Sequence, residues 1–79
     1  MCLYEYSLHA ELEGFRSVRI CRNDKEVAKA EAMKFINQWV KEMMEWDGYT
    51  REYAEGRIVI WHIDRTKPHY RAEFTRLPF

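Results

Sequence analysis

The sequence predicts an α+β domain in which one long helix packs on one face of an antiparallel sheet, in the order strand, strand, helix, strand, strand, strand (ββαβββ). Three observations carry this prediction. Residues 2–12 alternate between apolar and polar side chains, whereas residues 23–46 contain neither Gly nor Pro and repeat apolar residues at the helical period. Strand-like runs separated by turn signals follow Gly48. We expect residues 1–79 to form a single domain, because a chain of this length has room for only one core.

The first two strands are predicted over residues 2–12 and 15–22. One face of the first strand carries Cys2, Tyr4, Tyr6, Leu8, Ala10 and Leu12. A three-residue turn at Glu13-Gly14, with Gly14 in the left-handed conformation, pairs Leu8 with Val18 and keeps the apolar side chains of both strands on one face. A two-residue turn would split them, so the three-residue turn is favoured.

The two cysteines, Cys2 and Cys21, are too few for a disulfide framework and lack the paired spacing of a zinc site. The register of the hairpin places them on opposite faces of the sheet. We therefore expect no disulfide between them, no metal and no cofactor, and we interpret each as a small buried apolar residue.

The long helix is predicted to begin at the capping-box pair Asn23 and Glu26 and to continue to Trp46. Gly48 is expected to end it in the left-handed conformation. The predicted core stripe consists of Ala28, Ala32, Phe35, Ile36, Trp39, Met43 and Trp46, and Met33, Val40 and Met44 lie on its shoulder.

Three further strands are predicted after the helix. They span residues 49–54, 57–64 and 69–75. The middle one is apolar on both faces, which is typical of a central strand. A second bulged turn, at Gly56, and a four-residue loop after Arg65 place Val59, Trp61, Ile63 and Phe74 on the core side. Ile58 and Ile60 would then face outward.

Charge and chain length disfavour two classes of function. The chain has 13 basic and 13 acidic residues, so it lacks the basic excess that is typical of nucleic-acid-binding proteins. A core this small leaves little room for an enclosed active site. His62 and Asp64 are the nearest approach to an acid–base pair, yet the sequence places no nucleophile beside them. We expect a protein that is not an enzyme.

The sequence also indicates where the protein acts. No apolar run approaches the roughly 18 to 20 residues that cross a bilayer. The N-terminus has neither a basic region nor a small-residue cleavage site typical of a secretory signal. We expect a cytoplasmic protein without a membrane partner, present as a monomer or a homodimer.

The acidic end of the helix is the first candidate binding surface. Glu42, Glu45 and Asp47 gather where the helix dipole favours cations, and Met44 adds adaptable apolar area beside them. Helix stability does not explain such a cluster. It is therefore predicted to contact a basic partner surface.

The side of the sheet away from the helix is the second candidate, with Ile58, Ile60 and Arg71 as its predicted contact residues. Basic residues also follow the second and the last strand, at Arg16, Arg19, Arg22, Arg65, Lys67, Arg71 and Arg76. A basic ribbon of this kind supports the alternative function, a small nucleic-acid-binding module.

Two segments carry a resemblance to a known class of proteins. The first is Val18-Arg19-Ile20 leading into Asn23-Asp24-Lys25-Glu26-Val27-Ala28-Lys29-Ala30, and the second is the run from Tyr53 to Ile60. In this pattern of strands and helix the chain resembles the small phage-encoded anti-CRISPR proteins. The resemblance implies a stoichiometric, non-enzymatic inhibitor that binds a subunit of a host CRISPR-Cas complex.

Overall fold

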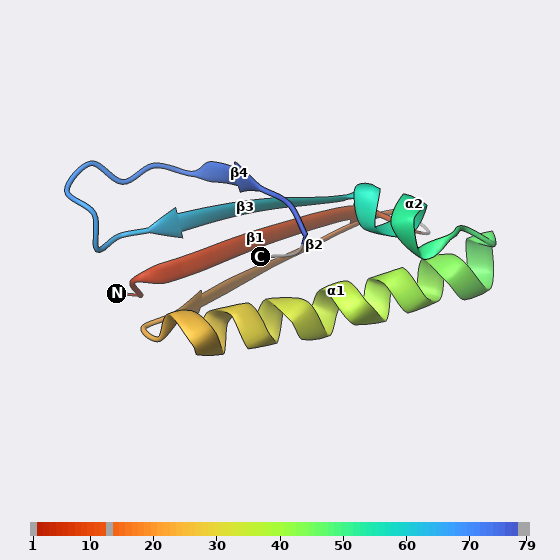
Figure 1. Ribbon diagram of the computed structural model, residues 1–79, viewed down its shortest axis with the longest axis horizontal. Coiled ribbons are helices and arrows are strands. Elements are labelled where there is room, and N and C mark those ends of the chain that lie inside the picture. The colour runs from red at the N-terminus through yellow and green to blue at the C-terminus, as the bar shows by residue number, and fades with distance from the viewer. Residues whose placement is uncertain (1, 13, 78–79) are drawn as a thin grey trace.

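The computed structural model describes residues 2–12 and 14–77 and shows an α+β fold, as predicted. Its elements are β1 (Tyr4–Glu11), β2 (Phe15–Arg22), α1 (Lys25–Asp47), α2 (Arg51–Gly56), β3 (Ile58–Asp64) and β4 (Glu73–Thr75). The strands form one antiparallel sheet in the order β2-β1-β3-β4. Figure 1 shows α1 running along one side of this sheet and α2 at the end where β3 begins.

The hairpin of β1 and β2 has the predicted register. Leu8 lies opposite Val18 and Tyr6 lies opposite Ile20. Gly14 has a φ of +105°, a backbone conformation that a side chain would strain, so glycine is required in this turn. Glu13 lies outside the described residues.

The helix α1 begins one residue later than the predicted cap. The Asp24 side chain, rather than that of Asn23, accepts hydrogen bonds from backbone N–H groups of the first turn. Asn23 instead accepts a hydrogen bond from the Leu3 N–H, at 3.2 Å, and so ties the helix start to the chain before β1. Gly48 ends α1 with a φ of +70°, as predicted.

The core lies between α1, α2 and the face of the sheet that carries Leu8. Its buried apolar residues are Tyr6, Leu8, Ala10, Leu12, Ile20, Ala28, Ala32, Ile36, Trp39, Val40, Met43, Ala54, Ile58 and Ile60. The buried arc of α1 is turned toward Val40, so the predicted stripe was wrong at Phe35 and Trp46, which are 41% and 52% exposed. Trp46 is exposed because a 23-residue helix, about 34 Å long, extends past eight-residue strands of about 26 Å.

Among the described residues, neither helix has the length and apolar character needed to span a bilayer.

The segment after Gly48 folds as the short helix α2, so the prediction of a strand over residues 49–54 was wrong. Thr50 caps this helix by accepting a hydrogen bond from the Tyr53 N–H, at 3.2 Å. Ala54 is fully buried against the core. The predicted hairpin turn at Gly56 is absent from this described segment, because Gly56 is the last residue of the helix.

The strand β3 is central, as predicted, but its two faces are the reverse of the prediction. Ile58 and Ile60 are 6% and 2% exposed, whereas Val59 and Trp61 are 38% and 40% exposed. Because β3 pairs directly with β1, Ile60 lies opposite Leu8 and shares its inward face. The prediction failed because it took the orientation of β3 from a hairpin that does not form.

The last strand is shorter than predicted. β4 contains only Glu73–Thr75, while residues 69–72 of the predicted strand belong to the loop that follows β3. This loop carries the exposed side chain of Arg71.

Candidate interaction surface on the open face of the sheet

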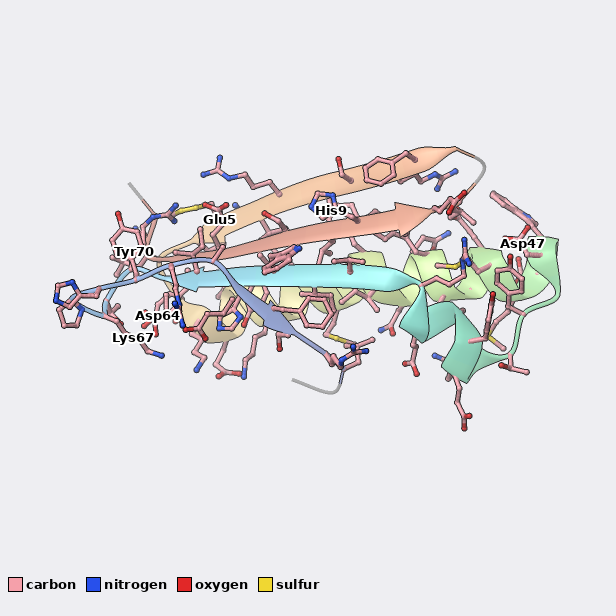
Figure 2. The ribbon with its side chains drawn as sticks, turned by 90° about the horizontal axis from the view of Figure 1, so that it is seen from above. Glu5, His9, Asp47, Asp64, Lys67 and Tyr70 are labelled. Carbon is pink, nitrogen blue, oxygen red and sulfur yellow. A yellow bond between two sulfur atoms is a disulfide. The ribbon has the colours of Figure 1, made fainter. Side chains whose placement is uncertain are left out.

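Both helices lie on one side of the sheet, and the opposite side carries a row of exposed aromatic and apolar side chains. We call this surface the open face and define it by Phe15, Val59, Trp61 and Phe74, which are 74%, 38%, 40% and 46% exposed. His9 of β1 lies between them, opposite Val59 and near the centre of the view in Figure 2.

The aromatic rings of the open face contact one another across strands. The Trp61 and Phe74 rings, on β3 and β4, meet edge to face with 5.5 Å between their centroids. The His9 and Phe15 rings, on β1 and β2, lie 5.8 Å apart. Such contacts fix the orientation of the rings while one side of each remains in water.

An ion pair closes the open face at the end near α2. An Arg57 Nη atom lies 3.0 Å from a Glu11 carboxylate oxygen. The same guanidinium lies 5.8 Å from the ring centroids of both Tyr49 and Tyr53. The rim here is therefore polar, with both charges compensated.

A buried carboxylate marks the other end of the open face. Oε1 of Glu5 accepts hydrogen bonds from Arg19 at 2.8 Å and from Arg65 at 2.9 Å, and its side chain is only 9% exposed. The hydrogen bond from Arg19 lowers the pKa of Glu5, burial opposes this effect, and Arg65 lowers the pKa further. The alternation of residues 2–12 puts Glu5 on the polar face of the strand, where exposure to solvent is expected. The missing signal was the loop after β3, which brings Arg65 over it.

A disulfide between Cys2 and Cys21 lies beside this carboxylate, so the prediction of no disulfide was wrong. The Cα atoms are 5.5 Å apart, within the usual range. Cys2 precedes β1, which begins at Tyr4, so the alternation of that strand does not extend to it. The chain bends at Leu3 and brings Cys2 to the face that carries Cys21.

The disulfide and its neighbours do not make a favourable metal site. Cys2, Glu5 and Cys21 have their ligand atoms within 4.8 Å of one another. However, the two sulfur atoms are bonded to each other, and an Arg65 Nη atom lies 3.6 and 3.9 Å from them. A fixed guanidinium at this point repels a metal cation.

The acidic residues predicted to form one surface at the end of α1 do not all face the same way. Glu42 points to the sheet, where it pairs with Arg16 at 2.8 Å and also accepts a hydrogen bond from Gln38. Glu45, Asp47 and Met44 are exposed, Met44 by 36%. Figure 2 shows Asp47 at the opposite end of the molecule from Glu5.

The three residues predicted to contact a partner on the uncovered side of the sheet, Ile58, Ile60 and Arg71, do not form one surface in the structure. Ile58 and Ile60 are in the core and offer no surface to a partner, because β3 has the reverse orientation. Arg71 is exposed, in the loop after β3. The sequence analysis missed Trp61 and Phe74, both assigned to the core, although it placed them correctly on one common face.

Comparison with family models, with curated proteins and with solved structures finds no match.

Proposed function

We propose that this chain is a non-enzymatic protein-binding module that docks a partner protein on its open face. The observation that carries the proposal is the edge-to-face pair of Trp61 and Phe74 on a side of the sheet that neither helix covers. Tryptophan supplies large contact areas at protein interfaces and is enriched among residues that dominate binding energy. The partner we propose presents an apolar patch that covers this pair.

The arrangement of charges supports a protein partner with an apolar centre and a polar periphery. The Glu11–Arg57 pair lies at one end of the open face, and Glu5 with its arginines lies at the other. An apolar centre inside a polar rim is the common organisation of protein interfaces.

The same charges weigh against the alternative function, nucleic-acid binding. Arg57 is paired with Glu11, and Arg19 and Arg65 share the Glu5 carboxylate, so two carboxylates offset most of the positive charge that these three arginines could offer to phosphates. The Trp61 ring also meets its neighbour edge to face, whereas binding platforms for single strands offer ring faces to bases.

A matched pair of tryptophan variants tests the proposal. Trp61→Ser removes the centre of the open face, and Trp46→Ser removes a tryptophan that is at least as exposed, from the far end of α1. A partner captured from host lysate is purified, and its affinity is measured by isothermal titration calorimetry. We expect Trp61→Ser to weaken binding by at least tenfold, which corresponds to about 1.4 kcal/mol, and Trp46→Ser to leave it unchanged.

Three outcomes would contradict the proposal. Equal affinity of the Trp61→Ser and wild-type proteins would exclude the open face. Saturable binding of a single-stranded DNA or RNA 20-mer at about 0.15 M salt, lost in Trp61→Ser, would favour the nucleic-acid alternative. A concentration-dependent dimer that Trp61→Ser dissociates would identify a second copy of this chain as the occupant.

The resemblance to anti-CRISPR proteins supplies a specific form of the proposal, in which the partner is a subunit of a host CRISPR-Cas complex and the protein acts in the cytoplasm. Expression of the chain in a bacterium with active CRISPR immunity should restore plaques of a targeted phage. Trp61→Ser should abolish this effect and Trp46→Ser should retain it. Unchanged immunity with confirmed expression would contradict this form.

A further inference from the structure

A cavity of about 190 Å³ lies on the helix side of the sheet, away from the open face. It is formed where the first turns of α1 meet the start of β1 and the end of β3, and its walls include Tyr4, Lys25, Lys29, His62, Asp64 and Lys67. Figure 2 shows Asp64 and Lys67 together at the end of the molecule where Glu5 lies. These residues come from four separate segments of the chain.

Three lysines line this cavity, together with the carboxylate of Asp64. Lys25 and Lys29 lie one turn apart on α1, and Lys67 comes from the turn after β3. Within residues 2–12 and 14–77, the ion pairs of the structure involve arginines and a histidine, and none includes these lysines. Three lysine charges at the cavity are therefore opposed chiefly by one carboxylate, that of Asp64, which leaves an excess of positive charge.

The carboxylates near the cavity compensate only part of this charge. Asp64 accepts hydrogen bonds from the hydroxyl and the backbone N–H of Thr66, and these bonds, with smaller contributions from the charges of Lys67 and Lys25, lower its pKa and hold it ionised. Glu5 contributes to the wall, but its carboxylate is bound by Arg19 and Arg65. Glu26, which acts electrostatically on Tyr6, is not part of the lining.

A histidine at the cavity has unused hydrogen-bonding capacity. His62 Nδ1 is buried and has no hydrogen-bond partner among the described residues. Its ring stacks near that of Tyr6, with 6.0 Å between the centroids, and its Nε2 lies 4.0 Å from Glu73. A buried nitrogen without a partner is costly, so this wall of the cavity contains a hydrogen-bonding group whose demand is unmet.

We propose that this cavity binds a phosphate group, either as free inorganic phosphate or as the head of a small phosphomonoester. Lysines bind phosphate as point charges, and two elements held in a fixed relation place Lys29 and Lys67 on its walls. A hollow of about 190 Å³ has room for a phosphate with a few further atoms. The site lies apart from the open face and does not depend on the proposed protein-binding function.

Titration of ¹⁵N-labelled protein followed by NMR tests this proposal. Inorganic phosphate and glycerol 3-phosphate are added at constant ionic strength, with sodium chloride alone as the reference. We expect saturable shifts of the amides of Lys29, His62, Asp64 and Lys67. Tighter binding of the ester would identify a phosphomonoester as the ligand, and equal or weaker binding would identify free phosphate.

Two double variants distinguish binding in the cavity from nonspecific attraction of phosphate to surface lysines. Lys29→Gln/Lys67→Gln removes cavity charges, while Lys34→Gln/Lys41→Gln removes two exposed helix charges outside the cavity. We expect the first to weaken binding at least tenfold and the second to leave it within twofold. Shifts that never saturate, shifts centred elsewhere, or equal weakening in both variants would overturn the proposal. The dispersion of each amide spectrum shows that the variant is folded.

Discussion

Arg65, in the turn after β3, donates a hydrogen bond to the Glu5 carboxylate of β1 across 2.9 Å, and both side chains are largely withdrawn from water. Arg19 of β2 binds the same oxygen from the other side. This carboxylate therefore joins three parts of the chain that meet at one end of the sheet. Charge-assisted hydrogen bonds of this kind are stronger than neutral ones, especially where water is excluded.

The stability of the protein should depend on the ionisation of Glu5. Its pKa lies below the ordinary 4.5, so the unfolded chain binds the proton first as the pH falls. The stabilisation is complete above about pH 4.5 and is lost as the pH falls through the lower native pKa. Glu5→Gln is expected to lower the free energy of unfolding by about 1 to 3 kcal/mol at pH 7. Urea denaturation between pH 7 and pH 3 measures both effects.

The comparison must allow for Asp64, whose pKa is also lowered, chiefly by the Thr66 hydroxyl. Part of the acid-induced loss will therefore remain in Glu5→Gln. Glu45→Gln, on the exposed end of α1, is the matched control and should behave like the wild type. If Glu5→Gln and wild type lost stability in parallel with pH, the carboxylate would not have the linkage described.

Reduction of the Cys2–Cys21 disulfide should destabilise the protein. The bond closes a loop with a sequence separation of 19, for which the loss of chain entropy on cross-linking corresponds to about 3 kcal/mol. Thermal unfolding with and without a phosphine reductant measures the change. The double variant Cys2→Ser/Cys21→Ser should unfold at a temperature close to that of the reduced wild type, and the reductant should not change this temperature. Wild-type unfolding that is indifferent to the reductant would show that the bond contributes nothing.

The orientation of β3 can be tested with two adjacent residues. Ile60→Ala should lower the free energy of unfolding by about 2 to 5 kcal/mol, because Ile60 is fully packed opposite Leu8. Val59→Ala, on the open face, should change it by about 0.5 kcal/mol or less. Chemical denaturation of both variants decides between the two orientations. A larger loss for Val59→Ala would restore the orientation predicted from the sequence.

The parts of the fold that the sequence predicted correctly are those defined by local patterns. The alternation of β1, the glycine required at position 14 and the uninterrupted helical period each specify a structure without reference to distant residues. The orientation of β3 was predicted through a turn, and that turn is a helix instead. Pairing with β1, more than 45 residues earlier in the chain, decides which side of β3 is buried.

The prediction of the candidate site was wrong for a related reason. Trp61 and Phe74 belong to the open face. The exposure of the Trp61 side chain on β3 follows from the long-range pairing of β3 with β1. Local composition favoured burial of both aromatic residues. The cover over Glu5 similarly depends on a loop from the far end of the chain. Periodicity does not contain this information.

Charge reversal at the end of α1 distinguishes structural from exposed acidic residues. The last turn of α1 has no basic residue, and lysine there interacts favourably with the helix dipole. Glu45→Lys should therefore raise the free energy of unfolding by about 0.3 to 1 kcal/mol. Glu42→Lys should lower it by about 1 kcal/mol or more, because the lysine would replace the partner of Arg16 with a like charge. Urea denaturation monitored by circular dichroism measures both changes.

The same variants decide between the two binding surfaces that the sequence suggested. If the partner docks on the open face, Glu45→Lys will associate at the wild-type rate and with the wild-type dependence on salt. Trp61→Ser, with an intact helix end, will lose binding in the same assay. Slower association of Glu45→Lys with a flatter salt dependence, in a protein whose circular dichroism is unchanged, would place the partner on the acidic end of α1 instead.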